Sequence, residues 1–136
     1  MKKQKFEDII TSQGKLIYTN VGDSMFPLIQ PRDLLVIKAV TEPLKKYDIP
    51  LYKRDSEQYV LHRIVKIKNG SYVMCGDNRD FPEYGITDRH IIGILTDIIR
   101  NGETIPVQRP KNNLWFKSML YRKIITKLRK AKAKSK

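Results

Sequence analysis

The sequence predicts a mainly β domain, a compact curled sheet or partly closed barrel, with a short N-terminal helix and a basic amphipathic C-terminal helix. Three observations support this fold class. Short β-branched or alternating segments recur through residues 15–107, Asn-Gly pairs join two pairs of these segments, and no helices alternate with them. A chain of 136 residues builds one domain around one core, which excludes large multidomain proteins.

The first element expected is a short helix over residues 3–13. Phe6, Ile9 and Ile10 recur there at helical spacing in an otherwise polar segment. Gly14 follows directly and is typical of a helix C-terminus, so we expect the helix to end there.

Seven candidate strand segments follow the helix, one of them weaker than the rest. The candidate segments are 15–21, 34–40, 47–53, 59–68, 71–75, 90–100 and 103–107. The segment 34–40 is an apolar, β-branched run typical of a buried strand. Pro50 weakens the segment 47–53, because proline suits a sheet edge or a bulge. Asn69-Gly70 and Asn101-Gly102 each predict a hairpin between the segments that flank them.

The charge divides the sequence at residue 110. Residues 1–110 carry 17 Lys and Arg and 14 Asp and Glu, a net of +3, whereas residues 111–136 carry 10 basic residues and no acid, a net of +10. We therefore expect a body, 1–110, and a basic tail, 111–136. Apolar residues at helical spacing predict an amphipathic helix over 113–130, followed by a frayed end from 131 to 136.

The tail suits more than one partner. Trp115, Phe116 and Tyr121 stand beside lysines, which favours an anionic membrane surface because aromatic rings prefer the headgroup level. The competing expectation is that Trp115, Met119 and Leu120 pack on the body, and nucleic acid is the less favoured partner. No apolar run reaches membrane-spanning length and no signal-peptide core follows the N-terminus. The expected location is cytoplasmic, with peripheral attachment to the inner face of the membrane as the hypothesis.

Two polar side chains are candidates for a nucleophile and its base. Ser24 lies in the Gly-Asp-Ser-Met-Phe-Pro turn of residues 22–27, and His62 lies in an apolar alternating segment. Taken alone, Ser24 is typical of a helix cap or turn, and His62 of a half-buried histidine bonded to the backbone. An unperturbed pKa of about 6.5 makes His62 the natural general base if Ser24 lies opposite.

Carboxylates and arginines gather in residues 76–80 and 87–89. A solvated turn held by local hydrogen bonds and ion pairs explains most such clusters. The catalytic interpretation requires one carboxylate to orient His62 through its second ring nitrogen. Cys75 is the one cysteine and His90 the one other histidine, so the sequence predicts no internal disulfide, metal site or cofactor.

The order and content of these segments resemble the type I signal peptidase superfamily of serine peptidases, which includes the self-cleaving LexA-type repressor domain. The matching segments are 21–27 for the nucleophile, 34–37 and 47–49 for the strands that follow it, 62–65 for the general base, and 76–80 through 88–89 for the acidic segment. The resemblance spans residues 16–95.

The resemblance implies a serine endopeptidase with Ser24 as nucleophile and His62 as general base. Asp88 maps onto the acid that holds the imidazole, with Asp77 as the second candidate. The backbone N–H of Ser24, in a turn that contains Gly22, is the expected oxyanion donor.

The chain differs from most of the family in three respects. Most bacterial signal peptidases have a lysine base, so His62 makes the resemblance nearer to the Ser/His branch found in the endoplasmic reticulum, archaea and some Gram-positive bacteria. Arg32 and Tyr47 stand where the family has glycines. The typical N-terminal membrane anchor is not seen in the sequence.

The expected function is cleavage of a leader or signal-like peptide within an extended segment. One alternative is a LexA-like self-processing domain, which the lack of a helix-turn-helix pattern before the β segments disfavours. The other is a catalytically silent binding module whose basic tail contacts membrane or nucleic acid. A serine-directed covalent probe separates the enzyme from the module.

Overall fold

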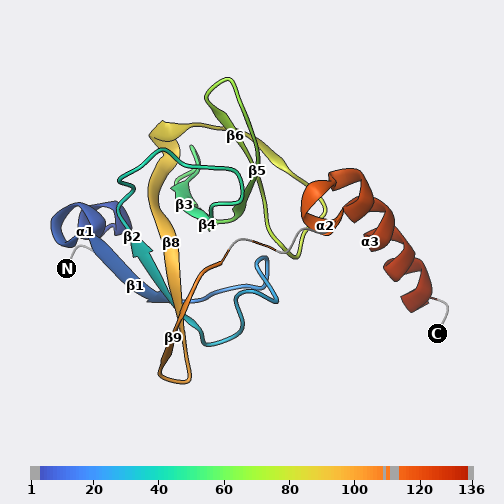
Figure 1. Ribbon diagram of the computed structural model, residues 1–136, viewed down its shortest axis with the longest axis horizontal. Coiled ribbons are helices and arrows are strands. Elements are labelled where there is room, and N and C mark those ends of the chain that lie inside the picture. The colour runs from blue at the N-terminus through green and yellow to red at the C-terminus, as the bar shows by residue number, and fades with distance from the viewer. Residues whose placement is uncertain (1–3, 109, 111–113, 135–136) are drawn as a thin grey trace.

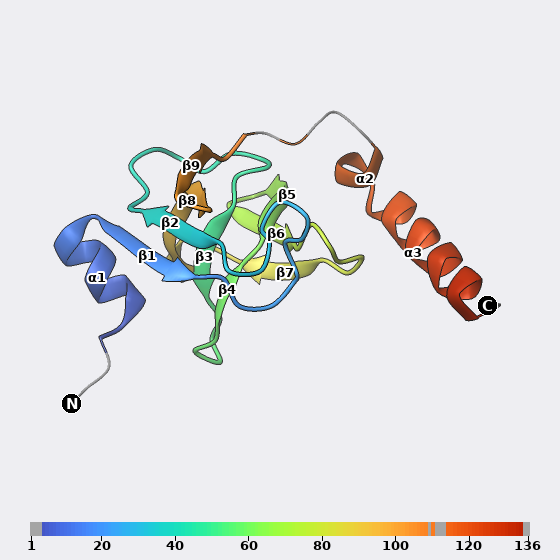
Figure 2. The ribbon, with the colours of Figure 1, turned by 90° about the horizontal axis from the view of Figure 1, so that it is seen from below.

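The computed structural model describes residues 4–108, 110 and 114–134. It confirms the mainly β prediction, with a strongly curled sheet between a short N-terminal helix and a C-terminal helical segment (Figure 1). Helix α1 (Phe6–Gln13) lies at one end of the body, and helices α2 (Leu114–Lys117) and α3 (Met119–Lys134) lie at the other. Figure 2 shows that α3 projects away from the strands.

Antiparallel strands form two sheets in the described part of the chain. They are β1 (Lys15–Thr19), β2 (Leu34–Lys38), β3 (Pro50–Lys53), β4 (Tyr59–Leu61), β5 (Arg63–Lys68), β6 (Ser71–Cys75), β7 (Glu83–Ile86), β8 (Ile91–Arg100) and β9 (Glu103–Pro106). The larger sheet has the order β1-β2-β8-β3-β4 with β9 paired to β8, and the smaller has the order β5-β6-β7. The register shifts where β8 meets β2 and again where it meets β3, and such bulges increase the bend of a sheet.

The predicted turns are confirmed. Asn69-Gly70 joins β5 to β6 and Asn101-Gly102 joins β8 to β9, with positive φ at all four residues. Two consecutive positive φ angles are what a two-residue hairpin turn of this kind requires. Gly14, with a φ of 74°, ends α1 as expected.

The strands differ from the predicted segments at three places. The segment 59–68 is not one strand, because the chain breaks at His62 and continues from β4 in the larger sheet to β5 in the smaller one. Of the two expectations for Pro50, the sheet edge is wrong, because β3 pairs with both β4 and β8. The bulge agrees with the register shift that follows Leu51, and Pro50 is the first residue of the strand. Strand β7 was not predicted, because it is short, includes Gly85 and carries little apolar alternation.

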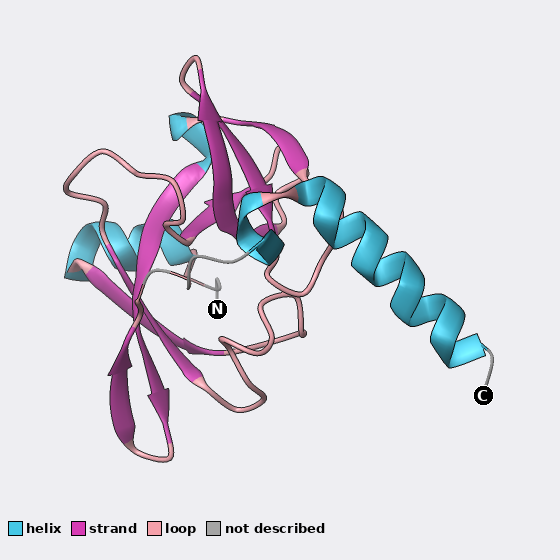
Figure 3. Cartoon of the chain, turned by 45° about the vertical axis from the view of Figure 1, so that its right-hand side comes forward, coloured by secondary structure: helices cyan, strands magenta, loops and turns pink. Residues whose placement is uncertain are grey.

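The C-terminal helical segment differs from the single helix predicted over residues 113–130. Two helices are present, separated at Ser118, and the second continues to Lys134 instead of ending near residue 130 (Figure 3). Residue 113 lies outside the described residues. No described helix has the length and apolar character needed to cross a membrane.

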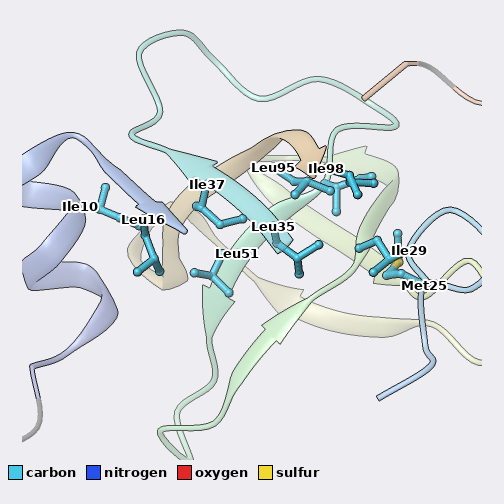
Figure 4. Packing of buried hydrophobic residues seen from close by; sticks show 10 residues of the cluster. Ile10, Leu16, Met25, Ile29, Leu35, Ile37, Leu51, Leu95 and Ile98 are labelled. Atoms are coloured by element: carbon cyan, nitrogen blue, oxygen red, sulfur yellow. The ribbon is translucent and has the colours of Figure 1, made fainter. Parts of the chain in front are cut away.

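The main hydrophobic core lies inside the curl of the larger sheet. Its labelled members in Figure 4 are Ile10, Leu16, Met25, Ile29, Leu35, Ile37, Leu51, Leu95 and Ile98. Met25 and Ile29 come from the connection between β1 and β2, where they are 4% and 2% exposed. The core therefore anchors the turn that presents Ser24.

Candidate active site around Ser24 and His62

The turn between β1 and β2 presents Ser24 at the surface of the core. The side chain that follows it, Met25, is buried, whereas Ser24 itself is only half-buried. Within the described residues the Ser24 hydroxyl has no hydrogen-bond partner, and neither has the Ser24 backbone N–H. A hydroxyl in this state is available to a base and to a substrate.

A distant loop, residues 76–80, supports this turn. The Asn78 backbone N–H donates to the Ser24 carbonyl oxygen at 2.8 Å, and Arg79 forms an ion pair with Asp23 at 2.7 Å. Gly76 packs so closely that a Cβ atom there would lie 2.5 Å from the Ser24 carbonyl oxygen. The position of Ser24 thus depends on contacts with a loop more than 50 residues later.

His62 lies between β4 and β5 and belongs to neither strand, so the alternating pattern of the strands does not determine which way its side chain faces. Ser24 and His62 line the same cleft, whose volume is about 490 Å³. The other lining residues are Phe6, Tyr18, Asn20, Val21, Met25, Ile29, Leu35, Leu51, Arg54, Gln58, Tyr59, Val60, Leu61, Arg79 and Phe81. In the part of the chain described, Nε2 of His62 has no hydrogen-bond partner.

The other ring nitrogen of His62 faces a buried tyrosine. The Tyr52 hydroxyl oxygen lies 3.4 Å from Nδ1 of His62 and donates to Oε1 of Glu83 at 2.7 Å. Arg54 donates to both carboxylate oxygens of Glu83, at 2.8 and 2.9 Å. His62 therefore contacts a tyrosine–glutamate pair that an arginine holds in place.

The environment keeps His62 neutral. Burial, with a smaller effect from the nearby Arg54 guanidinium, lowers the pKa of His62 to about 4. The Arg79 guanidinium acts in the same direction, whereas the Glu83 and Asp77 carboxylates oppose it. At neutral pH the imidazole is thus unprotonated, which is the state that a general base requires.

The two carboxylates predicted as the acid lie outside this cleft. Asp77 is 4% exposed and forms a bidentate ion pair with Arg63, both contacts at 2.8 Å. Asp88 is exposed, accepts a hydrogen bond from Tyr72 at 2.5 Å, and lines a different cavity of about 640 Å³. The structure thus places Ser24 and His62 in the lining of one cleft, and neither aspartate is in that lining.

Sequence reasoning missed Tyr52 and Glu83. Tyr52 reads as an ordinary apolar strand residue, and Glu83 as a charge in a turn-like segment. The two residues are 31 positions apart and meet only because β3 and β7 belong to different sheets that face each other at this point. A local sequence pattern therefore cannot predict this contact.

Arg32 and Tyr47, which replace glycines of the resembling family, adopt the glycine-like conformation. Their φ angles are 69° and 78°, in the left-handed region that side chains with a Cβ disfavour. Both residues therefore adopt a backbone conformation for which glycine is the preferred residue.

The C-terminal helices pack on the far side of the loop 76–80. Trp115 donates its indole N–H to the Asp77 carbonyl oxygen at 2.7 Å. Arg122 is fully buried and donates to the Gly76 and Arg79 carbonyl oxygens at 3.0 and 3.2 Å. The expectation that the tail packs on the body thus holds for its first turns.

Leu120 does not follow that expectation. It is 69% exposed, and Ile124 and Leu128 on the same helix face are 50% and 60% exposed. The fully buried Arg122 lies on the opposite face of α3. The apolar stripe of this helix consequently points away from the body.

The described residues contain no group of His, Cys, Asp and Glu side chains arranged to hold a metal ion. Cys75 is buried, and burial raises the pKa of its thiol.

Comparison with known proteins gives one family. A family model described as Peptidase S24-like matches residues 4–99. This range contains Ser24, His62 and both candidate aspartates, and it ends before α2. No match was found among curated proteins.

Proposed function

The chain belongs to the Peptidase S24-like family, and from this premise we propose that it is a serine endopeptidase using Ser24 and His62. Membership supports a serine peptidase or a LexA-like self-cleaving domain in general. The single observation that supports the specific pair is the shared cleft, in which the Ser24 hydroxyl and Nε2 of His62 have no other partner among the described residues.

In the proposed reaction the Ser24 hydroxyl attacks the scissile carbonyl carbon while Nε2 of His62 takes the hydroxyl proton. The same nitrogen returns this proton to the leaving amine, and the C–N bond breaks to leave an acyl-enzyme. Water then attacks the ester, giving its proton to His62, and Ser24 is regenerated. The backbone N–H of Ser24 is the proposed donor to the oxyanion.

The proposed substrate is an extended peptide segment, such as a leader or signal-like peptide. The cleft wall carries apolar side chains, including Tyr18, Ile29 and Leu35. Val21 and Phe81 also line it and are 91% and 63% exposed, so they form an apolar rim at its mouth. Apolar walls of this kind suit small or apolar side chains of a substrate.

The test is covalent labelling of the purified protein with a fluorophosphonate probe. We expect one label per chain, located on Ser24 by mass spectrometry, and no label on Ser24→Ala. Ser12→Ala is the matched control, because Ser12 is exposed on α1 and lies outside the cleft. Equal labelling of Ser24→Ala and the wild type would refute the proposal and favour the silent binding module.

Incubation of the unlabelled protein separates the peptidase from the self-processing alternative. A peptidase acting on other chains keeps its own intact mass while it cleaves added peptides. A self-processing domain instead loses mass at a rate that does not depend on protein concentration and that Ser24→Ala abolishes.

We also propose that the outward face of α3 binds an anionic membrane surface. The exposed stripe of Leu120, Ile124 and Leu128 supplies apolar area, and exposed Lys123 and Lys127 lie beside it. On an anionic membrane, the apolar side chains of the stripe would enter the acyl-chain region, and the lysines would contact the negatively charged headgroups. This proposal concerns where the peptidase works, and it is tested independently of the catalytic pair.

A further inference from the structure

The hydroxyl of Tyr52 lies between the candidate base and a carboxylate. It is 3.4 Å from Nδ1 of His62 and 2.7 Å from Oε1 of Glu83. Tyr52 is fully buried on β3, which pairs with strands on both sides, so its ring has a fixed position. The carboxylate that accepts this hydrogen bond belongs to Glu83, the first residue of β7, in the other sheet.

The direction of the hydrogen bonds follows from the chemistry of Glu83. Burial disfavours the charged form of this carboxyl, but hydrogen bonds from Arg54 and Tyr52 outweigh it and hold the pKa of Glu83 below its ordinary value. An ionised carboxylate only accepts, so the single hydroxyl proton of Tyr52 is directed to Glu83. The tyrosine oxygen then offers only a lone pair to His62, and Nδ1 must carry the imidazole proton.

This tautomer is the one that general-base catalysis needs. With the proton on Nδ1, the lone pair of the neutral ring lies on Nε2, the nitrogen that has no partner in the described structure. In the opposite tautomer Nε2 already carries a proton, so it could not accept the proton of the Ser24 hydroxyl.

We propose that Tyr52, directed by Glu83, is the positioning residue that sets the tautomer and orientation of His62, in the place where a triad would have an acid. The proposal deepens the function proposed above and rests on His62 as the base. Asp88, the acid predicted from the sequence, is the competing candidate, although its carboxylate accepts from Tyr72 and lines another cavity.

The pair differs from a lone aspartate in its charge. Glu83 is bound to Arg54 by two hydrogen bonds, so the group behind Tyr52 is close to neutral. Arg79 and Asp77 also act on the pKa of His62, and they act in opposite directions. Tyr52 and Glu83 are therefore suited to hold the ring and fix its proton, and they add little attraction for the imidazolium.

The experiment measures the tautomer directly. Proton–nitrogen correlation spectra of protein labelled with ¹⁵N-histidine distinguish Nδ1–H from Nε2–H, and the chain has only two histidines, so His62→Gln assigns the signals. We expect Nδ1–H for His62 in the wild type at neutral pH. A wild-type protein with mainly Nε2–H would overturn the proposal.

Two variants test the two partners separately. Tyr52→Phe removes the acceptor, so we expect a mixture of tautomers and slower labelling of Ser24 by about 10- to 100-fold, the usual effect of losing an orienting partner. Glu83→Met frees the Tyr52 proton to donate to Nδ1, so we expect the Nε2–H form to dominate. Glu83 is about a third exposed, which keeps this second variant informative if the first fails to fold.

Tyr72→Phe is the matched control, because it removes the other tyrosine–carboxylate hydrogen bond, that to Asp88. We expect it to leave both the tautomer and the labelling rate unchanged. A tautomer that shifts in Asp88→Asn and stays fixed in Tyr52→Phe would assign the orienting role to Asp88 and overturn the proposal. The spectra do not depend on turnover, so failure of the Ser24 labelling test remains distinguishable from failure of this inference.

Discussion

The backbone carbonyl of Ser24 accepts a hydrogen bond from the backbone N–H of Asn78, and the two atoms are 2.8 Å apart. This bond joins the turn that presents the candidate nucleophile to the loop that follows β6. The same loop is joined to the strand after His62 by the buried ion pair between Arg63 and Asp77. One loop thus sets the spacing between the two halves of the candidate site.

Substitution of Gly76 tests this relationship. Gly76→Ala places a Cβ atom 2.5 Å from the Ser24 carbonyl oxygen, so the turn or the loop must move. We expect the free energy of unfolding in urea to fall by about 1–3 kcal/mol and the labelling of Ser24 to slow. Gly102→Ala is the control, since it strains a hairpin turn with open space around it and leaves the cleft alone. Wild-type labelling by Gly76→Ala would contradict the argument.

The pH dependence of Ser24 labelling reports the state of His62. Its pKa of about 4 means that the imidazole is neutral at neutral pH and becomes protonated, and inactive as a base, only as the pH falls through that value. We expect the labelling rate to be constant from neutral pH down to about pH 5 and to fall below it. A decline centred near the ordinary histidine pKa would contradict the low value.

Substitution of Arg54 should shift the pH dependence of Ser24 labelling in a direction that the structure predicts. Its guanidinium disfavours the imidazolium, so Arg54→Gln should raise the pKa of His62 and move the acid limb of the profile to higher pH. Arg89→Gln is the matched control, because Arg89 pairs with Asp55 on the surface and is not one of the main charges that shift the pKa of His62. An acid limb that stays in place in Arg54→Gln would exclude the proposed electrostatic effect.

Arg32 provides a test of backbone strain. Its φ of 69° disfavours any residue with a Cβ. Arg32→Gly should be more stable in urea than Arg32→Ala by about 1 kcal/mol, because both lose the side chain and only glycine relieves the strain. Equal stability of the two variants would show that the turn relaxes to accept alanine.

The α3 surface is tested with lipid vesicles. The wild type should sediment with vesicles containing phosphatidylglycerol, less at high salt, and not with pure phosphatidylcholine. Replacing Leu120, Ile124 and Leu128 by serine should weaken binding at least tenfold, since each buried leucine is worth about 1.5–3 kcal/mol.

Ile105→Ser controls for the loss of exposed apolar area elsewhere, because Ile105 is 37% exposed on β9. Unchanged vesicle binding by the triple serine variant would refute the membrane proposal. Concentration-dependent dimerisation that this variant abolishes would instead assign the stripe to a second copy of the chain.

The sequence predicted those features that local patterns determine. The Asn-Gly hairpins, the end of α1 at Gly14 and the buried strand predicted for residues 34–40, observed as β2, follow from backbone preference and apolar runs, which neighbouring residues determine. The break at His62 was not predictable in this way, because Tyr59 to Lys68 alternates without interruption and only the division into two sheets forces the chain to turn.

The candidate site was predictable only where local sequence patterns mark its residues. Ser24 and His62 stood out through their segments, and the structure places both in one cleft. Tyr52 and Glu83 carry no such signal, since the contact between them depends on how two sheets face each other. The assignment of Asp88 as the acid stays a prediction, and the tautomer experiment decides between it and Tyr52.

Arg122 lies outside the range that matches the family, residues 4–99, yet it contributes to holding the loop 76–80 in place. Its guanidinium completes the hydrogen bonding of the Gly76 and Arg79 carbonyl oxygens from beyond the matched range. A relative that shared only the matched range would leave these oxygens to water or to another side chain. Variation outside the shared fold can therefore tune how firmly the nucleophile is held while every residue of the cleft stays the same.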